Sequence, residues 1–360
     1  MIILLQTGSK INQMEKVTRY LFSILWVFVA LLSKDVSSAI CGQERSAKDI
    51  YHIKDQKHSH HKHALGSSLQ TALGNLAMDI QKEKRKKGNG KSNRIVGGSD
   101  VNDPTGGRLC WQVMMQLNGR LGSVRCGGSI IGSRTILTAA HCVSTNRGSG
   151  PGGAIFPASM MEIMVGALDE AYNGSNPQHG AANCARKFDV AKIIRHPDYS
   201  KTTLNNDIAL LVLTDDINLD STCACPVCLQ RRNPVPGEWC INSGFGQESE
   251  SGEGDNNPLP FKYIYQQILQ NYEDPRCQYD SSTDGNDFVC AGGVAGIDNC
   301  YGDSGGPLVC HSQTSNTYYQ VGLVSYGQFE CGSGDGSRYT NVIRYLDWIV
   351  ANSNGNVAIA

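Results

Sequence analysis

Three residues far apart in the sequence have side chains that could together carry out nucleophilic catalysis. Ser304 lies in the segment GDSGGP, His141 in TAAHC and Asp207 in NNDIALLVL. A hydroxyl is a weak nucleophile at neutral pH, whereas an imidazole titrates in the range needed to take its proton and return it. A buried carboxylate can hold that imidazole in one tautomer. Taken singly, the three would be a turn residue, a core histidine and a strand-end cap. Taken together, they favour catalysis by an activated serine.

The segments around these residues must hold them in place, and their pattern is that of an all-β protein. After Arg94, short apolar runs alternate with stretches rich in Gly, Pro, Asn and Asp, as in strands joined by turns. Strands are expected at 111–117, 129–131, 135–140, 207–213, 307–310 and 320–326. Near the end of the chain apolar residues recur at helical spacing, which predicts a closing helix over 342–352.

The overall charge is balanced, with 32 Lys and Arg against 33 Asp and Glu, so it gives no indication of a nucleic-acid or membrane-surface partner. The balance hides an asymmetry. Residues 1–94 carry 16 basic and 7 acidic side chains, whereas residues 95–360 carry 16 and 26. The second part is long enough to bury a substantial core unaided. The change of composition therefore indicates a boundary close to Arg94.

The N-terminal region contains a candidate secretory signal. The apolar run LFSILWVFVALL, at 21–32, follows basic residues and precedes the small residues SSA. This order is typical of a signal peptide, and the run is too short to span a bilayer. We expect a signal peptide over 1–39 and a secreted, extracellular protein with no membrane span; a signal anchor is the alternative. The 14 cysteines agree, because secreted chains use cysteine as a disulfide framework.

The segment from 40 to 94 is poor in residues that could pack a core. It contains five of the nine histidines and the basic run KEKRKK, so we expect a flexible segment. Apolar residues at helical spacing leave an amphipathic helix over 65–83 as a hypothesis. The histidines could bind zinc or sense pH, but a solvated polar tract is the favoured interpretation because they show no fixed ligand geometry.

Four motifs together resemble a known family. RIVGG at 94–98, TAAHC, DIALL and GDSGGP occur in the order His, Asp, Ser that marks the trypsin- and chymotrypsin-like serine proteases. The resemblance covers about 95–352. It implies an all-β fold of two antiparallel β-barrels with a C-terminal helix, the active site in the cleft between the barrels, and a protease domain over 95–360. It also implies hydrolysis of peptide bonds by a serine endopeptidase.

The resemblance implies further roles around the serine. The backbone N–H groups of Gly302 and Ser304 would form the oxyanion hole, where donors stabilise the developing negative charge. Cleavage after Arg94 would free the amino group of Ile95 to pair with Asp303, so the chain would be made as an inactive zymogen. A buried carboxylate without a partner costs free energy, so the pair would form once cleavage has created the ammonium group, and its formation would activate the enzyme.

The specificity pocket also follows from the resemblance. Asp298 would lie at the base of the pocket and select Arg or Lys at the cleaved bond, because a long cationic side chain supplies the counter-charge. Ser325 and Gly327 would hydrogen-bond the substrate main chain. Ser337 takes a wall position usually held by glycine, so its hydroxymethyl group narrows the pocket or favours one of the two cations.

The cysteines divide into two groups under the resemblance. It implies four disulfides, namely Cys126 with Cys142, Cys240 with Cys310, Cys277 with Cys290, and Cys300 with Cys331. The other six are Cys41, Cys110, Cys184, Cys223, Cys225 and Cys228, which admit fifteen pairings. Cys228 resembles the cysteine that tethers the pro-segment, with Cys41 as its expected partner and Cys225 as the alternative. A thiolate metal site or a redox CxxC in CACPVC is less favoured than structural disulfides.

No cofactor and no metal is expected. Calcium-binding members of the family place a glutamate where this chain has Ala167-Leu168, although Asp169 and Glu170 follow. Asn173, in NGS, is the N-glycosylation acceptor pattern of the chain, so the protein is expected to be a glycoprotein if the site is used.

The expected partners are protein or peptide substrates with Arg or Lys at the cleavage site, and an activating protease or the enzyme itself. Neither nucleic acid nor a membrane is expected as a partner. Two other classes of function remain open: a catalytically silent binding homologue, and a metal- or polyanion-binding protein that acts through residues 40–94.

Overall fold

The computed structural model describes most of the chain after Arg94. It describes residues 41–42, 98–101, 109–117, 124–148, 150–181, 185–219, 223–247, 259–270, 273–277, 285–312, 315–327, 330–354 and 356–359. The candidate signal peptide, the amphipathic segment 65–83, the histidine cluster and the bond after Arg94 lie outside these residues.

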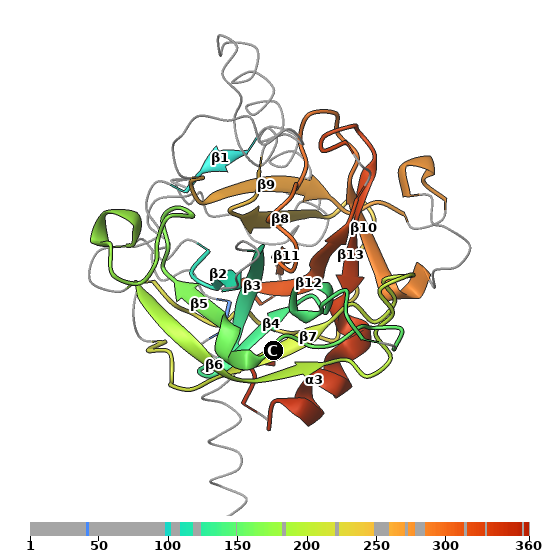
Figure 1. Cartoon of the computed structure of the whole chain (residues 1–360). Coiled ribbons are helices and arrows are strands. Elements are labelled where there is room, and N and C mark those ends of the chain that lie inside the picture. Colours follow the sequence, from blue (N-terminus) through green and yellow to red (C-terminus); the bar gives the residue numbers. More distant parts are fainter. Residues whose placement is uncertain are drawn as a thin grey trace, which may run out of the picture.

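The first half of the described chain forms a closed barrel. Six antiparallel strands pair in the order β2-β3-β4-β7-β6-β5 (Figure 1). Their bounds are β2 (Gln112–Leu117), β3 (Val124–Gly132), β4 (Thr135–Thr138), β5 (Met161–Val165), β6 (Arg186–Arg195) and β7 (Ala209–Leu213). A core of Val, Ile, Leu and Met side chains fills the barrel, as closure of such a small sheet requires.

The second half forms a seven-stranded antiparallel sheet in the order β1-β9-β8-β11-β12-β13-β10. Its strands are β1 (Ser99–Asp100), β8 (Trp239–Gly244), β9 (Lys262–Gln267), β10 (Phe288–Gly292), β11 (Pro307–Ser312), β12 (Thr317–Tyr326) and β13 (Gly336–Asn341). An isolated bridge between Ile268 and Ala291 joins the end of β9 to β10, so the sheet curls back towards itself. The expected all-β architecture of two antiparallel units is confirmed.

Within the described ranges, helical structure is short and lies between or after the strands. The 3-10 helices are η2 (His141–Val143), η3 (Ala158–Met160), η4 (Pro177–His179), η5 (Pro275–Cys277), η6 (Gly285–Asp287) and η7 (Val342–Tyr345), and the α-helix is α3 (Leu346–Asn352). The expected closing helix is thus present, but its first four residues form a 3-10 turn. Asn341 caps that turn by accepting the N–H of Ile343.

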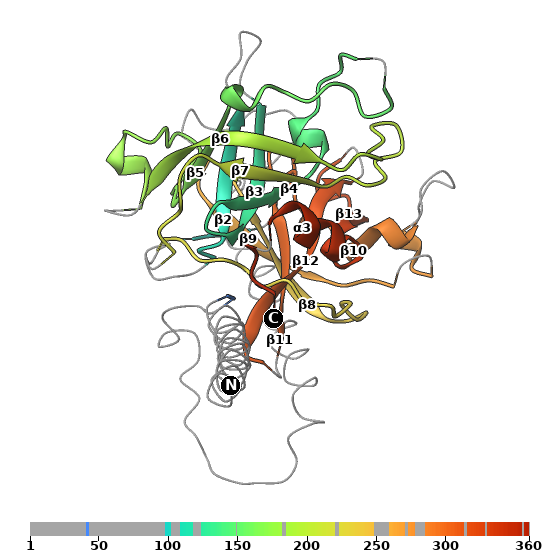
Figure 2. The same cartoon turned by 90° about the horizontal axis from the view of Figure 1, so that it is seen from below.

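The two β units share one hydrophobic core. Trp111 and Leu210 of the first unit pack in the same cluster as Leu323 of the second and Leu346 of α3. Figure 2 shows α3 beside the strands of both units. Buried hydrogen bonds also cross between the units, two of them between strands. Ser243 Oγ donates to Gln112 Oε1 at 2.7 Å, and Ser129 Oγ donates to Gln320 Oε1 at 2.6 Å. These contacts fix the relative position of the two halves.

Six disulfides join described residues. Four are the pairs implied by the sequence resemblance: Cys126–Cys142, Cys240–Cys310, Cys277–Cys290 and Cys300–Cys331. The other two are Cys41–Cys228 and Cys110–Cys225. Cys223 is also disulfide-bonded. The segment CACPVC is therefore neither a thiolate metal site nor a redox CxxC.

Residues 41–42 dock on the catalytic part beside the Cys41–Cys228 disulfide. The N–H of Gly42 donates to Pro226 O and its carbonyl accepts from Tyr318 N–H, both at 2.9 Å. Gly42 has a φ of +63°, and a Cβ there would lie 2.2 Å from Tyr318 O. Only glycine fits this close approach.

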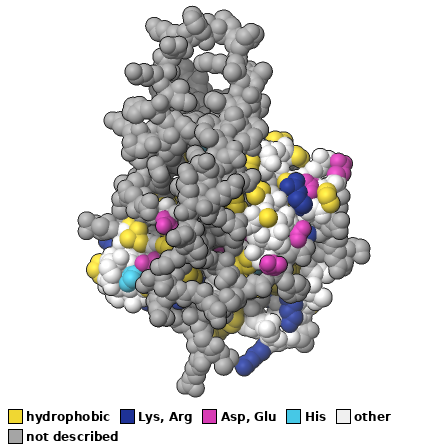
Figure 3. Space-filling view, turned by 90° about the horizontal axis from the view of Figure 1, so that it is seen from above, with side chains coloured by type: hydrophobic (Ala, Val, Ile, Leu, Met, Phe, Trp, Pro, Cys, Tyr) yellow, Lys and Arg dark blue, Asp and Glu magenta, His cyan; other side chains and the backbone are white. Residues whose placement is uncertain are grey.

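The described part of the molecule contains no helix long and apolar enough to cross a membrane. On the described part of the face in Figure 3, acidic and basic side chains are scattered among apolar and polar ones. The described side chains visible on this face form no large patch of one charge.

Candidate active site

His141 and Asp207 meet on the first barrel. His141 begins η2, directly after β4, and Asp207 precedes β7, the neighbour of β4 in the barrel. His141 Nδ1 lies 2.7 Å from Asp207 Oδ2, and the backbone N–H of His141 donates to Asp207 Oδ1 at 2.8 Å. A carboxylate only accepts, so Nδ1 carries the proton and Nε2 keeps its lone pair. The carboxylate thus sets the tautomer that a general base needs.

The second unit also holds Asp207. Ser325 Oγ, on β12, donates to Asp207 Oδ2 at 2.6 Å, and Thr340 Oγ1, on β13, donates to its backbone carbonyl at 2.9 Å. The Asp207 side chain is fully buried, whereas that of His141 is 25% exposed. The hydroxyl of Ser325 therefore has a contact that its expected main-chain role did not include.

The environment of His141 favours its protonated form. Burial lowers the pKa of His141, but the charge of Asp207 and the hydrogen bond to it raise the pKa by more, so the net direction is upward. An imidazole next to a fixed negative charge becomes a stronger base. The pair can therefore stabilise an imidazolium that forms during reaction.

Ser304 lies in the turn before β11, against the His141 segment. Its carbonyl accepts the N–H of Gly127 at 2.7 Å and lies 3.5 Å from Sγ of Cys142, the residue after His141. Gly305 follows with a φ of +75°, and a Cβ there would lie 2.3 Å from Thr138 Oγ1. Among the described residues no hydrogen bond joins the Ser304 hydroxyl to His141. Such bonds commonly tighten only when substrate is bound.

The backbone beside Ser304 offers two donors. Gly302 has a φ of +99°, a conformation that L side chains rarely adopt. Among the described residues, neither the N–H of Gly302 nor that of Ser304 has an acceptor, although the intervening Asp303 N–H donates to Cys300 O at 3.0 Å. Two unpaired N–H groups on one turn are suited to bind an oxyanion.

Asp303 is completely buried behind this turn. Its Oδ1 accepts the N–H of Gly246 at 2.8 Å, and its Oδ2 accepts the N–H of Cys300 at 2.9 Å. Burial raises the pKa of Asp303 to about 7 and outweighs the lowering by the N–H donors of Cys300 and Gly246; the charge of Asp298 adds the smallest contribution to the rise. No cation contacts this carboxylate within the described residues, and Ile95 lies outside them.

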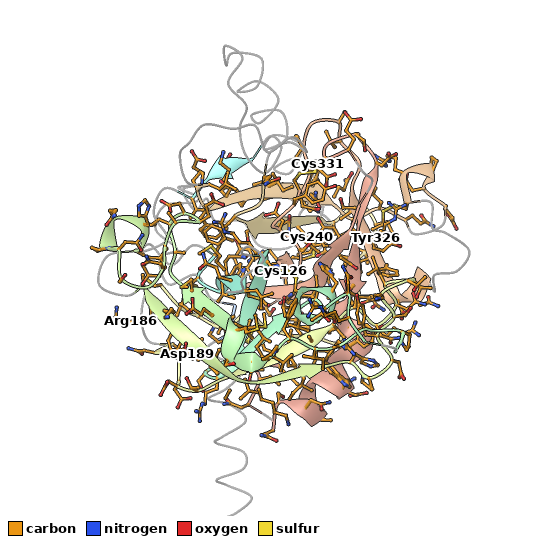
Figure 4. All side chains as sticks on the ribbon, viewed as in Figure 1. Cys126, Arg186, Asp189, Cys240, Tyr326 and Cys331 are labelled. Atoms are coloured by element: carbon orange, nitrogen blue, oxygen red, sulfur yellow. A yellow bond between two sulfur atoms is a disulfide. The ribbon has the colours of Figure 1, made fainter. Side chains whose placement is uncertain are left out.

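Asp298 lies in the loop between β10 and β11 and is 7% exposed. Ser337 Oγ donates to its Oδ1 at 2.7 Å, and Gly332 N–H lies 3.4 Å from its Oδ2. Burial raises the pKa of Asp298, and the hydrogen bonds from Ser337 and neighbouring donors oppose that rise. The Cys300–Cys331 disulfide braces the same loops; Figure 4 labels Cys331 and Tyr326 on this second unit and Cys126 on the first.

A buried polar network supports Asp298, and sequence reasoning missed it. Gln266 Nε2 lies 3.4 Å from Asp298 Oδ1. Tyr339 donates its hydroxyl hydrogen to Gln266 Oε1 and accepts from Asn299 Nδ2 at 2.8 Å. These residues come from β9, β13 and the Asp298 loop, so only the sheet register brings them together. The position of Asn299 next to Asp298 was the one available signal.

An arginine braces the loop that leaves η2. Arg195 Nη1, at the end of β6, donates to Ser144 Oγ at 2.9 Å and to Gly152 O at 2.6 Å. Ser144 Oγ in turn donates to Ala140 O at 2.7 Å, directly before His141. The Gly- and Pro-rich segment at 146–160 is therefore tied to the turn that carries the histidine.

The candidate metal ligands among the described residues already have protein partners. In the loop after Gly166, Asp169 Oδ2 pairs with His179 Nδ1 at 2.7 Å and Glu170 pairs with Arg125, so both carboxylates already have protein partners. The one Cys and His grouping with suitable proximity is Cys126, His141 and Cys142, whose two sulfurs form a disulfide. Asn173 is exposed on a surface turn.

Comparison with known proteins agrees with the geometry. The family model described as Trypsin matches residues 95–349. The chain is 32% identical over 272 residues to CLIP domain-containing serine protease B4 of Anopheles gambiae, an alignment covering 72% of this chain and 71% of the relative.

Two further relatives align over a similar part of this chain. Melanization protease 1 of Drosophila melanogaster is 32% identical over 278 residues, covering 72% of this chain and 65% of the relative. Ovochymase of Halocynthia roretzi is 33% identical over 271 residues, which is 72% of this chain but 15% of that longer protein. The chain therefore spans less than two thirds of these two relatives. The matched family, the fold and the serine protease relatives together show that the chain belongs to the trypsin family and is a serine endopeptidase.

Proposed function

We propose that the chain is the zymogen of a secreted endopeptidase that cleaves after Lys and Arg. Its signal peptide would span 1–39, its pro-segment 40–94 and its protease domain 95–360. The observation that carries the proposal is the coupling of His141 to Asp207 next to the Ser304 turn, with a second buried carboxylate, Asp298, on the adjoining loops.

The residues support a two-step hydrolysis. Ser304 Oγ attacks the carbonyl carbon of the peptide bond while His141 Nε2 takes its proton. The N–H groups of Gly302 and Ser304 stabilise the oxyanion, and Asp207 stabilises the imidazolium. The imidazolium protonates the leaving amine, and an acyl-enzyme remains on Ser304 Oγ. Water then attacks the ester with His141 again as the base, which releases the acid and restores the serine.

Asp298 would select the substrate. Its carboxylate is buried, so its charge is poorly stabilised by water, and a cationic side chain entering the pocket would supply the counter-charge. An apolar side chain would leave that carboxylate without a counter-charge. Arg or Lys is therefore the expected residue before the cleaved bond.

Activation would create the missing partner of Asp303. Cleavage after Arg94 gives Ile95 an α-ammonium group, and Asp303 lies buried beside the oxyanion turn with two N–H donors already in place. The cost of burying this carboxylate falls when the ammonium reaches it. The Cys41–Cys228 disulfide would keep the pro-segment attached after cleavage.

The proposal is tested by activating the purified chain with an added protease that cuts after Arg94. The product should react with a fluorophosphonate probe and hydrolyse peptides ending in Lys or Arg, but not matched peptides ending in Phe or Ala. Ser304→Ala is the control and should lose both reactions. A correctly cleaved protein that neither reacts with the probe nor hydrolyses any of the four peptides would contradict the triad assignment, and cleavage after Phe or Ala alone would contradict the role of Asp298.

A further inference from the structure

The two oxygens of Asp298 are unequally occupied. Oδ1 accepts from Ser337 Oγ at 2.7 Å and from the N–H of Asn299 at 2.9 Å, and Gln266 Nε2 lies 3.4 Å from it. Oδ2 has one described donor, the N–H of Gly332, at 3.4 Å. A carboxylate oxygen has about two lone-pair sites. Oδ1 is therefore saturated by the protein, whereas Oδ2 has room for a substrate donor.

The hydroxyl of Ser337 lies close to both the Asp298 carboxylate and Gly327. Ser337 pairs with Ala291 across β13 and β10 and is 2% exposed, so its position is fixed. A Cβ built on Gly327 would lie 3.3 Å from Ser337 Oγ. The same hydroxyl thus reaches towards both Gly327 and Asp298.

Lys and Arg make different demands on such a carboxylate. A guanidinium is a planar fork whose strongest contact uses both carboxylate oxygens, one N–H to each. An ammonium is a compact charge with three donors that need not lie in one plane. Because Oδ1 is saturated, a guanidinium cannot bind both oxygens without displacing a protein donor. An ammonium can still donate a hydrogen bond to Oδ2.

We propose that Ser337 makes this pocket select Lys over Arg, because its hydroxyl occupies the Asp298 oxygen that a bidentate guanidinium requires. The inference rests on the proposed cleavage after basic residues and names the preferred one. Ser337 donates its single hydrogen to Asp298, so its own lone pairs remain able to accept from a substrate. A lysine ammonium can then donate to both Asp298 Oδ2 and Ser337 Oγ.

One effect works in the opposite direction. An ammonium is more strongly hydrated than a guanidinium, so it loses more hydration free energy when it enters the pocket, and this favours Arg. This cost is the same with and without the Ser337 hydroxyl. The change caused by replacing Ser337 therefore isolates the contribution of the hydroxyl from the hydration of the two cations.

The test measures kcat/KM for two peptides that differ only in Lys or Arg at the cleaved bond. The activated wild-type enzyme should prefer the Lys peptide, and Ser337→Ala and Ser337→Gly should each move the ratio towards Arg by about tenfold, the value of one hydrogen bond to a charged group. Ser333→Gly is the matched control, because Ser333 is an exposed serine whose hydroxyl donates to Asp335 rather than to Asp298. Its ratio should equal that of the wild type.

Inhibitor binding gives a second readout that does not depend on turnover. Benzamidine presents a planar fork and n-butylamine presents an ammonium. Ser337→Ala should bind benzamidine about tenfold more tightly and n-butylamine no more tightly than the wild type. Titration with the fluorophosphonate probe counts the folded active sites of each variant, so a misfolded variant is recognised and corrected for.

The outcomes separate the two proposals. A wild-type enzyme that prefers Arg, or a Lys preference that Ser337→Ala and Ser337→Gly leave unchanged, overturns the role of Ser337 but leaves cleavage after basic residues standing. Failure to cleave either basic peptide, together with cleavage after Phe or Ala, overturns the proposed function itself.

Discussion

The buried carboxylate of Asp303 gives the uncleaved chain a characteristic pH dependence of stability. Its pKa rises from an ordinary value of 3.8 to about 7, mainly because of burial. A raised carboxyl pKa means that folding favours the protonated form. The associated stability is complete below pH 3.8 and is lost as the pH rises towards 7 and the folded protein must hold the charge.

The size of the effect follows from the two pKa values. The difference between 3.8 and about 7 corresponds to roughly 4 kcal/mol of unfolding free energy. Part of this stabilisation is already lost at pH 5, so the unfolding free energy decreases by about 2 to 3 kcal/mol between pH 5 and pH 8. Asp303→Asn cannot ionise and removes this component, although it adds a pH-independent cost because its amide NH₂ faces an N–H donor.

The assay is urea unfolding at pH 5, 6, 7 and 8. Both proteins carry Arg94→Gln to prevent activation and Ser304→Ala to prevent self-digestion, and they differ only in Asp303 or Asn. Between pH 5 and pH 8, the unfolding free energy of the Asp303 protein should fall by about 2 to 3 kcal/mol more than that of the Asn variant. If the two proteins lose the same unfolding free energy between pH 5 and pH 8, within about 1 kcal/mol, the reasoning is refuted, because the environment of Asp303 would then not penalise its charge.

Two further changes test the loop after η2 and the covalent tether. Arg195→Ala removes both hydrogen bonds of Arg195 to that loop, so cleavage after the exposed Arg147 by added trypsin should become about tenfold faster, as measured by mass spectrometry. The control is Lys192→Ala, which changes an exposed residue on the same strand. Equal cleavage rates for the two variants would show that Arg195 does not brace the loop. Cys41→Ser or Cys228→Ser should release the pro-segment after activation, giving two species on a non-reducing gel where the wild type gives one; a single species from either variant would show another attachment.

The sequence predicted the fold class and the members of the candidate triad because these signals are local. Ser304, His141 and Asp207 each lie in a short motif whose residue types are tied to one chemistry. Six strands, β2, β3, β4, β7, β11 and β12, followed from apolar runs between turn residues, whereas β1, β5, β6, β8, β9, β10 and β13 were not predicted. The closing helix was predicted as one element, whereas the structure begins it with a 3-10 turn, since the Asn341 cap tightens the first residues.

The contacts that could not be predicted depend on strand register. The hydrogen bond from Ser325 to Asp207, and the Gln266, Asn299 and Tyr339 network behind Asp298, join residues from strands far apart in the chain. A one-residue slip would turn each of these side chains to the other face of its sheet. Sequence spacing carries no direct record of that register, so these contacts needed the folded arrangement.

The hydrogen bonds between the two β units have a consequence for how this protein can be divided. Separating the halves would break the hydrogen bonds of Ser129 with Gln320 and of Ser243 with Gln112. Each polar group that then stays buried without a partner costs about 1 to 3 kcal/mol of free energy. It would also expose Trp111 and its neighbours to water. Neither half is therefore a self-sufficient module, and recombination within the family can exchange surface loops far more readily than whole barrels.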